Sequence, residues 1–166
     1  MPAVLEIARW VIAILFLATL AIASLSDIRD RRIPNWTVIV TAALFVPWAF
    51  LVPGNGLLSA FGAALMAFSI TLPLYFFGVI GAGDSKLLTV VGLFVGLSQF
   101  MQFLMLVALV GGAIAIVSLV SRPTRALVML QMRAKGNFGR GIPYGVAIAI
   151  AAAYTVTWPL ASHMLG

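Results

Sequence analysis

Long stretches without charge constrain this chain more than any other feature of its sequence. No Asp, Glu, Lys or Arg lies between Arg32 and Asp84, or between Lys86 and Arg122. With 63% hydrophobic and 8% charged residues, the chain has too little polar surface to cover a soluble domain of its size. Several apolar runs reach the roughly 20 residues that a membrane-spanning helix needs. The sequence therefore predicts an all-α integral membrane protein, built as a bundle of helices.

The apolar runs divide into six expected transmembrane helices within a single domain that covers residues 1–166. Their approximate ranges are 5–26, 34–52, 57–79, 84–99, 101–121 and 142–163. The apolar stretch from 84 to 121 is too long for one span, so we expect it to break at "GLSQF" (96–100).

The basic residues follow the expected topology. All of them except Arg9 fall in alternate connections, at 29–32, at 86 and at 122–140, whereas "VPGNG" and "GLSQF" carry no charge. The positive-inside rule makes the charged side cytoplasmic and predicts that both termini lie outside. The first span resembles a signal peptide in its small residues "AIASLS", but its start carries Glu6 and Arg9 instead of a basic cluster, so we expect it to be retained.

The composition also excludes several kinds of chemistry. The chain has no cysteine, and its one histidine is His163, so a thiolate metal site and Cys or Ser-His catalysis lack the residues they need. We expect no metal and no cofactor. The net charge of +6 is explained by the membrane topology, so it does not indicate a nucleic-acid partner.

Two of the four acidic residues mark the ends of expected spans. Asp27 ends the first span and Asp84 begins the fourth, and the topology places both at the cytoplasmic edge of the bilayer. Two readings are open: Asp84 is a helix cap and Asp27 a solvated partner of neighbouring arginines, or both are functional acids. Two carboxylates that share a water can activate it, because one keeps its proton while the other acts as base.

The surrounding residues favour the functional reading. Gly81 and Gly83 precede Asp84, and glycine allows a positive φ or the close approach of another backbone, such as an extended peptide. After Asp27, Ile33 is pushed toward an extended conformation by Pro34, which suits the start of a helix.

Three motifs in this order resemble the type IV prepilin peptidases, a family of GxGD membrane aspartic peptidases. "GAGDSKLL" (81–88) is similar to their G-x-G-D-x-K-L motif, "SDIRDRRIPNW" (26–36) to their first-aspartate motif, and "GIPYGVAIA" (141–149) to their last-span motif. The resemblance implies an aspartic endopeptidase with Asp27 and Asp84 as the catalytic pair, and leaves Asp30 as a surface charge. It implies further site residues: Gly81, Gly83 and Lys86 in the active-site loop, with support from Ile33, Pro34, Asn35, Pro143 and Gly145.

The small size and the absence of cysteine are similar to the CpaA/TadV-like members, which serve the tight-adherence (Flp) pilus and lack the N-terminal methyltransferase region. The resemblance then implies cleavage of the short basic leader of a prepilin at the cytoplasmic face of a bacterial inner membrane. The expected partners are the membrane-inserted prepilin, the lipid bilayer and the pilus assembly machinery. An archaeal-type preflagellin peptidase, a small proton-coupled transporter and a non-catalytic scaffold are the alternatives.

The basic loop 122–141 is compatible with an interfacial helix, though positive-inside retention explains its charge as well.

Overall fold

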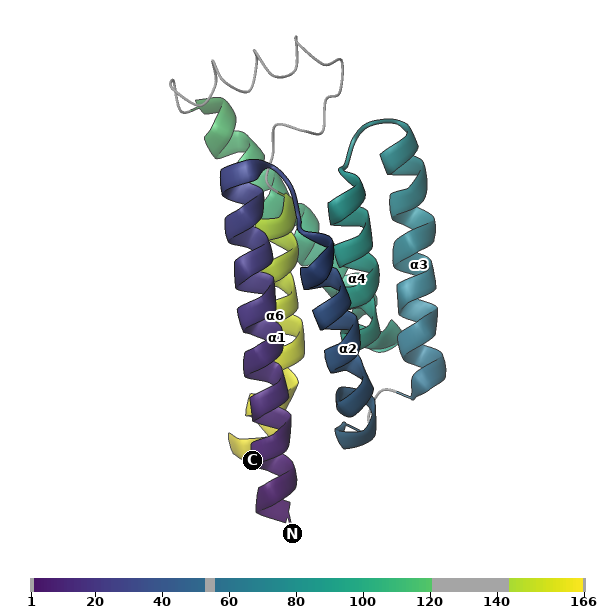
Figure 1. The fold of residues 1–166 in the computed structure, drawn as a ribbon, viewed down its shortest axis with the longest axis vertical. Coiled ribbons are helices and arrows are strands. Elements are labelled where there is room, and N and C mark those ends of the chain that lie inside the picture. The colour runs from purple at the N-terminus through teal and green to yellow at the C-terminus, as the bar shows by residue number, and fades with distance from the viewer. Residues whose placement is uncertain (1, 53–55, 121–143, 166) are drawn as a thin grey trace.

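The structure is a computed structural model, and it describes residues 2–52, 56–120 and 144–165. Within these residues the regular elements are α-helices: α1 (Pro2–Asp30), α2 (Asn35–Leu51), α3 (Leu57–Phe76), α4 (Ala82–Val120) and α6 (Tyr144–Leu165) (Figure 1). Three described segments are long and apolar enough to cross a membrane, namely Val4–Asp30, Leu57–Phe76 and Ala82–Ser118, while α2 and Tyr144–Leu160 are apolar but shorter. The all-α membrane fold is thus confirmed. The count of six spans and the side on which the termini lie stay predictions.

The first helix is longer than its apolar run. It continues to Asp30, past the predicted end at residue 26, because the end of an apolar run does not stop a helix whose backbone hydrogen bonds can continue. Asp27 therefore lies inside the last turn of α1 and not beyond it. The helix stops where Arg31 takes a left-handed φ of 53°, and the Arg31 N–H still donates to the carbonyl of Asp27 over 3.1 Å. This stop fixes the place of Asp27 at the helix end.

The start of α2 follows the prediction made from Pro34. This residue occupies the N-cap position with an extended ψ of 134°. Its carbonyl oxygen accepts two hydrogen bonds from Thr37, one from the backbone N–H over 3.1 Å and one from Oγ1 over 2.7 Å. The turn between α1 and α2 is therefore well defined on both sides.

Helix α4 turns back on itself at Gly96. Its 39 residues would extend for about 58 Å if they were straight, nearly twice the hydrocarbon core of a bilayer. Gly96 has φ 68° and ψ 169°, a region that only glycine enters readily. Beyond it, the Leu97 N–H donates to Oγ of Ser59 on α3 over 2.9 Å, so the second half begins with its own cap. The break predicted at residues 96–100 thus lies at its first residue, and Figure 1 shows the chain reversing there.

Small residues bring α3 and α4 together. Ala60, Ala63, Ala64 and Ala67 form the buried stripe of α3, and Gly92 of α4 lies against it. A Cβ on Gly92 would come within 3.2 Å of backbone atoms of Ala63 and Ala64. Helices in lipid gain little from the hydrophobic effect, so such close backbone packing is a main source of their association.

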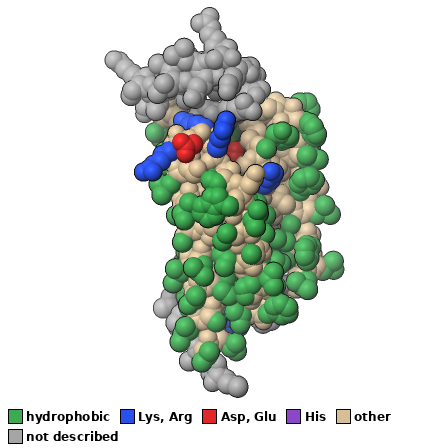
Figure 2. Space-filling model, in the orientation of Figure 1, with side chains coloured by type: hydrophobic (Ala, Val, Ile, Leu, Met, Phe, Trp, Pro, Cys, Tyr) green, Lys and Arg blue, Asp and Glu red, His purple; other side chains and the backbone are tan. Residues whose placement is uncertain are grey.

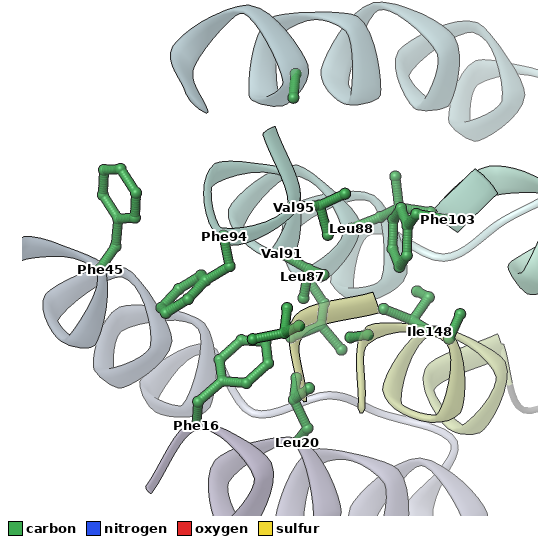
Figure 3. Packing of buried hydrophobic residues seen from close by; sticks show 14 of the residues in the cluster. Phe16, Leu20, Phe45, Leu87, Leu88, Val91, Phe94, Val95, Phe103 and Ile148 are labelled. Atoms are coloured by element: carbon green, nitrogen blue, oxygen red, sulfur yellow. The ribbon is translucent and has the colours of Figure 1, made fainter. Parts of the chain in front are cut away.

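Aromatic rings form the core where α4 meets α1 and α2. Phe94 of α4 stacks on Phe16 of α1 with ring centroids 4.3 Å apart, and it meets Phe45 of α2 edge-on at 5.6 Å (Figure 3). Trp48 of α2 lies at 5.6 Å on another side of the same ring. Phe94 thus joins three helices, and α4 packs in addition against α3 and α6, which makes it the centre of the bundle.

The two ends of the bundle differ in charge. At one end, Nε of Arg9 donates to the carbonyl of Leu51 over 2.7 Å and so ties the start of α1 to the end of α2. The other end holds the end of α1 with Arg29, followed by Arg31 and Arg32, and the start of α4 with Lys86. Figure 2 shows basic side chains gathered at this end and hydrophobic side chains over the visible face between the ends. This charge asymmetry agrees with the sides assigned to these described residues by the positive-inside rule.

Candidate active site

Asp27 continues the buried face of α1. Phe16, Leu20 and Ala23 form this face at helical spacing, and Asp27 follows one turn later with only 6% of its surface exposed. Its Oδ2 accepts a hydrogen bond from the backbone N–H of Gly145 over 2.9 Å. A carboxylate in such a place needs a donor, because burying a charge without a partner is costly. The start of α6 supplies this donor.

Gly145 fits against Asp27 only because it lacks a side chain. A Cβ at this position would lie 2.9 Å from Oδ2 of Asp27, 3.2 Å from its Cβ and 3.3 Å from its Cγ. Oγ of Ser24 also lies 3.2 Å from the carbonyl oxygen of Gly145, and it shares its one proton between this oxygen and the closer carbonyl of Leu20 at 2.8 Å. The N–H of Gly145 is therefore the main polar contact that sets the position of α6 relative to the aspartate.

Asp84 is the third residue of α4 and folds back on the loop before it. Its Oδ2 accepts the backbone N–H of Gly81 over 3.1 Å, which is the reciprocal half of a capping box. The capping role considered from the sequence is thus real, although Asp84 caps from the third helical position. Its Oδ1 is buried and has no hydrogen-bond partner within the described structure. One oxygen of Asp84 is therefore structural, and the other remains without a donor.

The two glycines of the loop are required by close contacts and not by a positive φ. Neither Gly81 nor Gly83 has a positive φ, in contrast to Gly78 and Gly96. A Cβ at Gly81 would lie 2.9 Å from Oδ2 of Asp84, and one at Gly83 would lie 3.0 Å from Cβ of Ile33. Of the two reasons for glycine considered from the sequence, the structure shows close contacts and no positive φ, and these contacts come from side chains of the same protein. The approach of an extended peptide to this loop stays a prediction.

The two aspartate segments lock together through Ile33, Asn35, Gly83 and Lys86. Ile33 is buried and packs on Gly83, as its 9% exposure and the contact above indicate. Two residues after Ile33 and three residues after Gly83, Nζ of Lys86 donates to Oδ1 of Asn35 over 3.3 Å. Pro34 lies between the two contacts as the cap of α2. Ile33, Pro34 and Asn35 therefore share one structural role, because their contacts hold the segment after α1 beside the start of α4.

The two carboxylates converge although they are far apart in sequence. Asp27 and Asp84 lie close enough for their negative charges to interact, and Arg31 lies close enough to Asp27 to attract its carboxylate. Asp30, by contrast, is exposed at the end of α1. The structure therefore brings together the two acids that the sequence selected and leaves the third at the surface.

The chemistry open to this site is that of a carboxyl pair. No group of three or more His, Cys, Asp and Glu side chains that might hold a metal occurs among the described residues. Two carboxyl groups that repel each other favour a state in which one is protonated, and such a pair can activate water and supply a proton to a leaving group.

Sequence reasoning missed Ser24 and Tyr144 as neighbours of the aspartates. Ser24 lies one turn before Asp27 on the same helix face, a spacing that was available as a signal. Tyr144 directly precedes Gly145, and its phenol lies within electrostatic range of Asp84. Pro143 and the basic loop 122–141 lie outside the described residues, as does the side chain of His163.

A comparison with known protein families agrees with the resemblance found from the aspartate motifs. The model of the type IV leader peptidase family matches residues 14–116, which include both aspartates and the contacts between their segments. The segment 141–149 lies beyond the matched range. The searches of curated proteins and of solved structures gave no match. With the greater part of the chain matched and both aspartate motifs meeting at one end of a membrane helix bundle, the chain belongs to the type IV leader peptidase family.

Proposed function

We propose that this protein is a membrane aspartic endopeptidase that removes the short basic leader from prepilins of the tight-adherence (Flp) type. In this proposal Asp27 and Asp84 activate the attacking water at the cytoplasmic face of a bacterial inner membrane. The observation that carries the proposal is the convergence of the buried carboxylate of Asp27 and the half-buried carboxylate of Asp84 from the ends of α1 and α4, where their charges interact.

The proposed reaction is a hydrolysis that uses both carboxyl groups. The ionised carboxylate removes a proton from water as the water oxygen bonds to the carbonyl carbon of the scissile peptide. The protonated carboxyl shares its proton with the carbonyl oxygen. The carbon–nitrogen bond then breaks, and the amine nitrogen takes the proton that the first carboxylate removed from water, while the other carboxyl takes its own proton back as the product carboxyl group forms. Water is the only co-reactant, and each carboxyl returns to its starting state.

The position of the site fits a membrane-inserted substrate. Asp27 lies in the last turn of α1 and Asp84 in the first turn of α4, at the end of the bundle that carries Arg29 and Lys86. The leader of a prepilin emerges from the bilayer on the cytoplasmic side and would meet the enzyme at such an end. A proton relay of a transporter would place its acids deeper in the membrane, so this position favours the peptidase.

The test is co-expression with a candidate Flp prepilin and measurement of the pilin size on a blot. We expect cleavage by the wild type and none by Asp27→Asn or Asp84→Asn. Asp30→Asn is the matched control, because Asp30 lies on the same helix end but is exposed, and we expect it to cleave normally. Wild-type cleavage by either Asp27→Asn or Asp84→Asn would refute the two-aspartate mechanism.

A parallel co-expression addresses the choice of substrate. A preflagellin is co-expressed in place of the prepilin, and the cleavage of the two substrates is compared. Because both would bind at the same site, a difference in cleavage reports which leader the enzyme prefers. Efficient cleavage of the prepilin alone supports the Flp assignment. Preferential cleavage of the preflagellin would replace it with the archaeal-type alternative, while the catalytic pair would stay the same.

A further inference from the structure

Tyr144 stands at the point where α6 reaches both aspartates. It is the first residue of α6, and the next residue, Gly145, donates its N–H to Asp27 over 2.9 Å. The phenol of Tyr144 lies within electrostatic range of the carboxylate of Asp84. Tyr144 thus lies directly beside the residue whose backbone binds Asp27, at the end of the bundle that also holds Asp84.

The ring of Tyr144 has a defined packing partner. It is half-buried and lies over Gly111 in the second half of α4, where a Cβ would come within 3.5 Å of Cε1 and 3.6 Å of Cδ1. This contact exists because α4 reverses at Gly96, since along a straight helix Gly111 would be about 40 Å from Asp84. The fold therefore holds the ring near the aspartates from the side of α4, while Gly145 holds it from the side of α1.

The site has more hydrogen-bond acceptors than donors, and a phenol can supply a donor. Asp84 Oδ1 is buried without a hydrogen-bond partner in the described structure, and an ionised carboxylate accepts hydrogen bonds but donates none. During peptide hydrolysis the carbonyl oxygen gains negative charge as water adds, and it needs donors at that moment. A phenol donates one hydrogen bond and stays protonated near neutral pH.

We propose that Tyr144 is a third catalytic residue of this site, whose hydroxyl donates a hydrogen bond to the carbonyl oxygen of the scissile peptide bond. This proposal rests on the proposed peptidase function. No covalent bond to the hydroxyl forms or breaks in the reaction. Its hydrogen bond acts together with the proton that the protonated carboxyl shares with the same oxygen. Because the negative charge develops only as water adds, the contribution of the hydroxyl appears in kcat and not in KM.

The test is Tyr144→Phe in the full-length protein, assayed with purified prepilin in detergent. The substitution keeps the ring that packs over Gly111 and removes only the hydroxyl, so the fold is expected to persist. Loss of one such donor lowers kcat by about 10²-fold or more in other enzymes, and we expect at least a tenfold loss here with KM unchanged. Tyr154→Phe is the matched control, because Tyr154 lies on the same helix, is 45% exposed and stacks on Trp158. We expect it to behave as the wild type.

The outcomes separate this inference from the proposed function. A wild-type kcat in Tyr144→Phe, or a change confined to KM, overturns the role of the hydroxyl. If Asp27→Asn and Asp84→Asn are inactive in the same assay, the peptidase mechanism survives that result. If those two variants cleave as the wild type does, the proposed function itself fails. Size-exclusion elution of each variant at the wild-type volume confirms that the comparison is made between folded proteins.

Discussion

Gly145 holds Asp27 by donating its backbone N–H to Oδ2 over 2.9 Å, and it does so across most of the chain length. The contact leaves no space for a methyl group, since a Cβ would lie 2.9 Å from the same oxygen. Helix α6 is therefore part of the proposed active site through its backbone. Carboxylate orientation and helix packing depend on one residue.

Gly145→Ala is expected to impair cleavage strongly while the protein still accumulates in the membrane. The added methyl must displace either the Asp27 carboxylate or α6, and a misplaced catalytic group of this kind commonly costs about 10²-fold in rate. The measurement is the rate of prepilin cleavage at equal amounts of membrane protein. Gly112→Ala is the control, because a Cβ at Gly112 meets nothing within 4 Å. Equal rates in the two variants would contradict the proposed close fit.

Lys86 and Asn35 are expected to act as a pair. Their hydrogen bond of 3.3 Å joins the two aspartate segments at an exposed place, so each single alanine variant should slow cleavage by only about two- to threefold. The double variant should be no slower than the worse single variant, because both changes remove the same contact. Rates of the four proteins in a double-mutant cycle measure this coupling. Additive losses would mean that Lys86 has a separate role.

Gly96→Ala is expected to destabilise the bundle. The φ of 68° and ψ of 169° at Gly96 are accessible to glycine and strained for other residues, at a cost of about 1–3 kcal/mol. The free energy of unfolding should fall by this amount, which is measurable as a lower midpoint in a denaturation series in detergent. Gly112→Ala again serves as control within the same helix. An unchanged midpoint in Gly96→Ala would show that the reversal does not depend on this conformation.

The sidedness of the protein can be tested with single cysteines, because the natural chain has none. Arg32→Cys lies at the end of the bundle with the aspartates, and Gly56→Cys lies in the connection before α3, where a side chain meets no neighbour within 4 Å. We expect a membrane-impermeant maleimide to label Gly56→Cys in intact spheroplasts and Arg32→Cys only after permeabilisation. The reverse pattern would overturn both the topology and the proposed cytoplasmic site.

The catalytic candidates were accessible from sequence because their signals are local. Asp84 follows two glycines and precedes an apolar run, and Asp27 precedes Ile33 and Pro34. The local sequence of each segment therefore predicts where its aspartate lies. The break in α4 was predictable for a similar reason, since its apolar stretch exceeds the length of one span.

Other features depend on contacts that no local pattern encodes. The reason for Gly83 is the side chain of Ile33, and the reason for Gly145 is the carboxylate of Asp27. Both contacts arise only when helices distant in sequence pack together. The end of α1 was placed too early because hydrophobicity reports where lipid ends, whereas the helix ends where Arg31 leaves the helical conformation.

The two aspartates also differ in when they become ready during synthesis. Asp84 takes its N–H from Gly81, three residues earlier, so its geometry can form as soon as the start of α4 leaves the ribosome. Asp27 is made much sooner but waits for the N–H of Gly145, which follows 118 residues later in the chain. A nascent or truncated chain that ends before Gly145 therefore carries both acids with only one of them oriented. We expect proteolytic competence to appear only after α6 has docked.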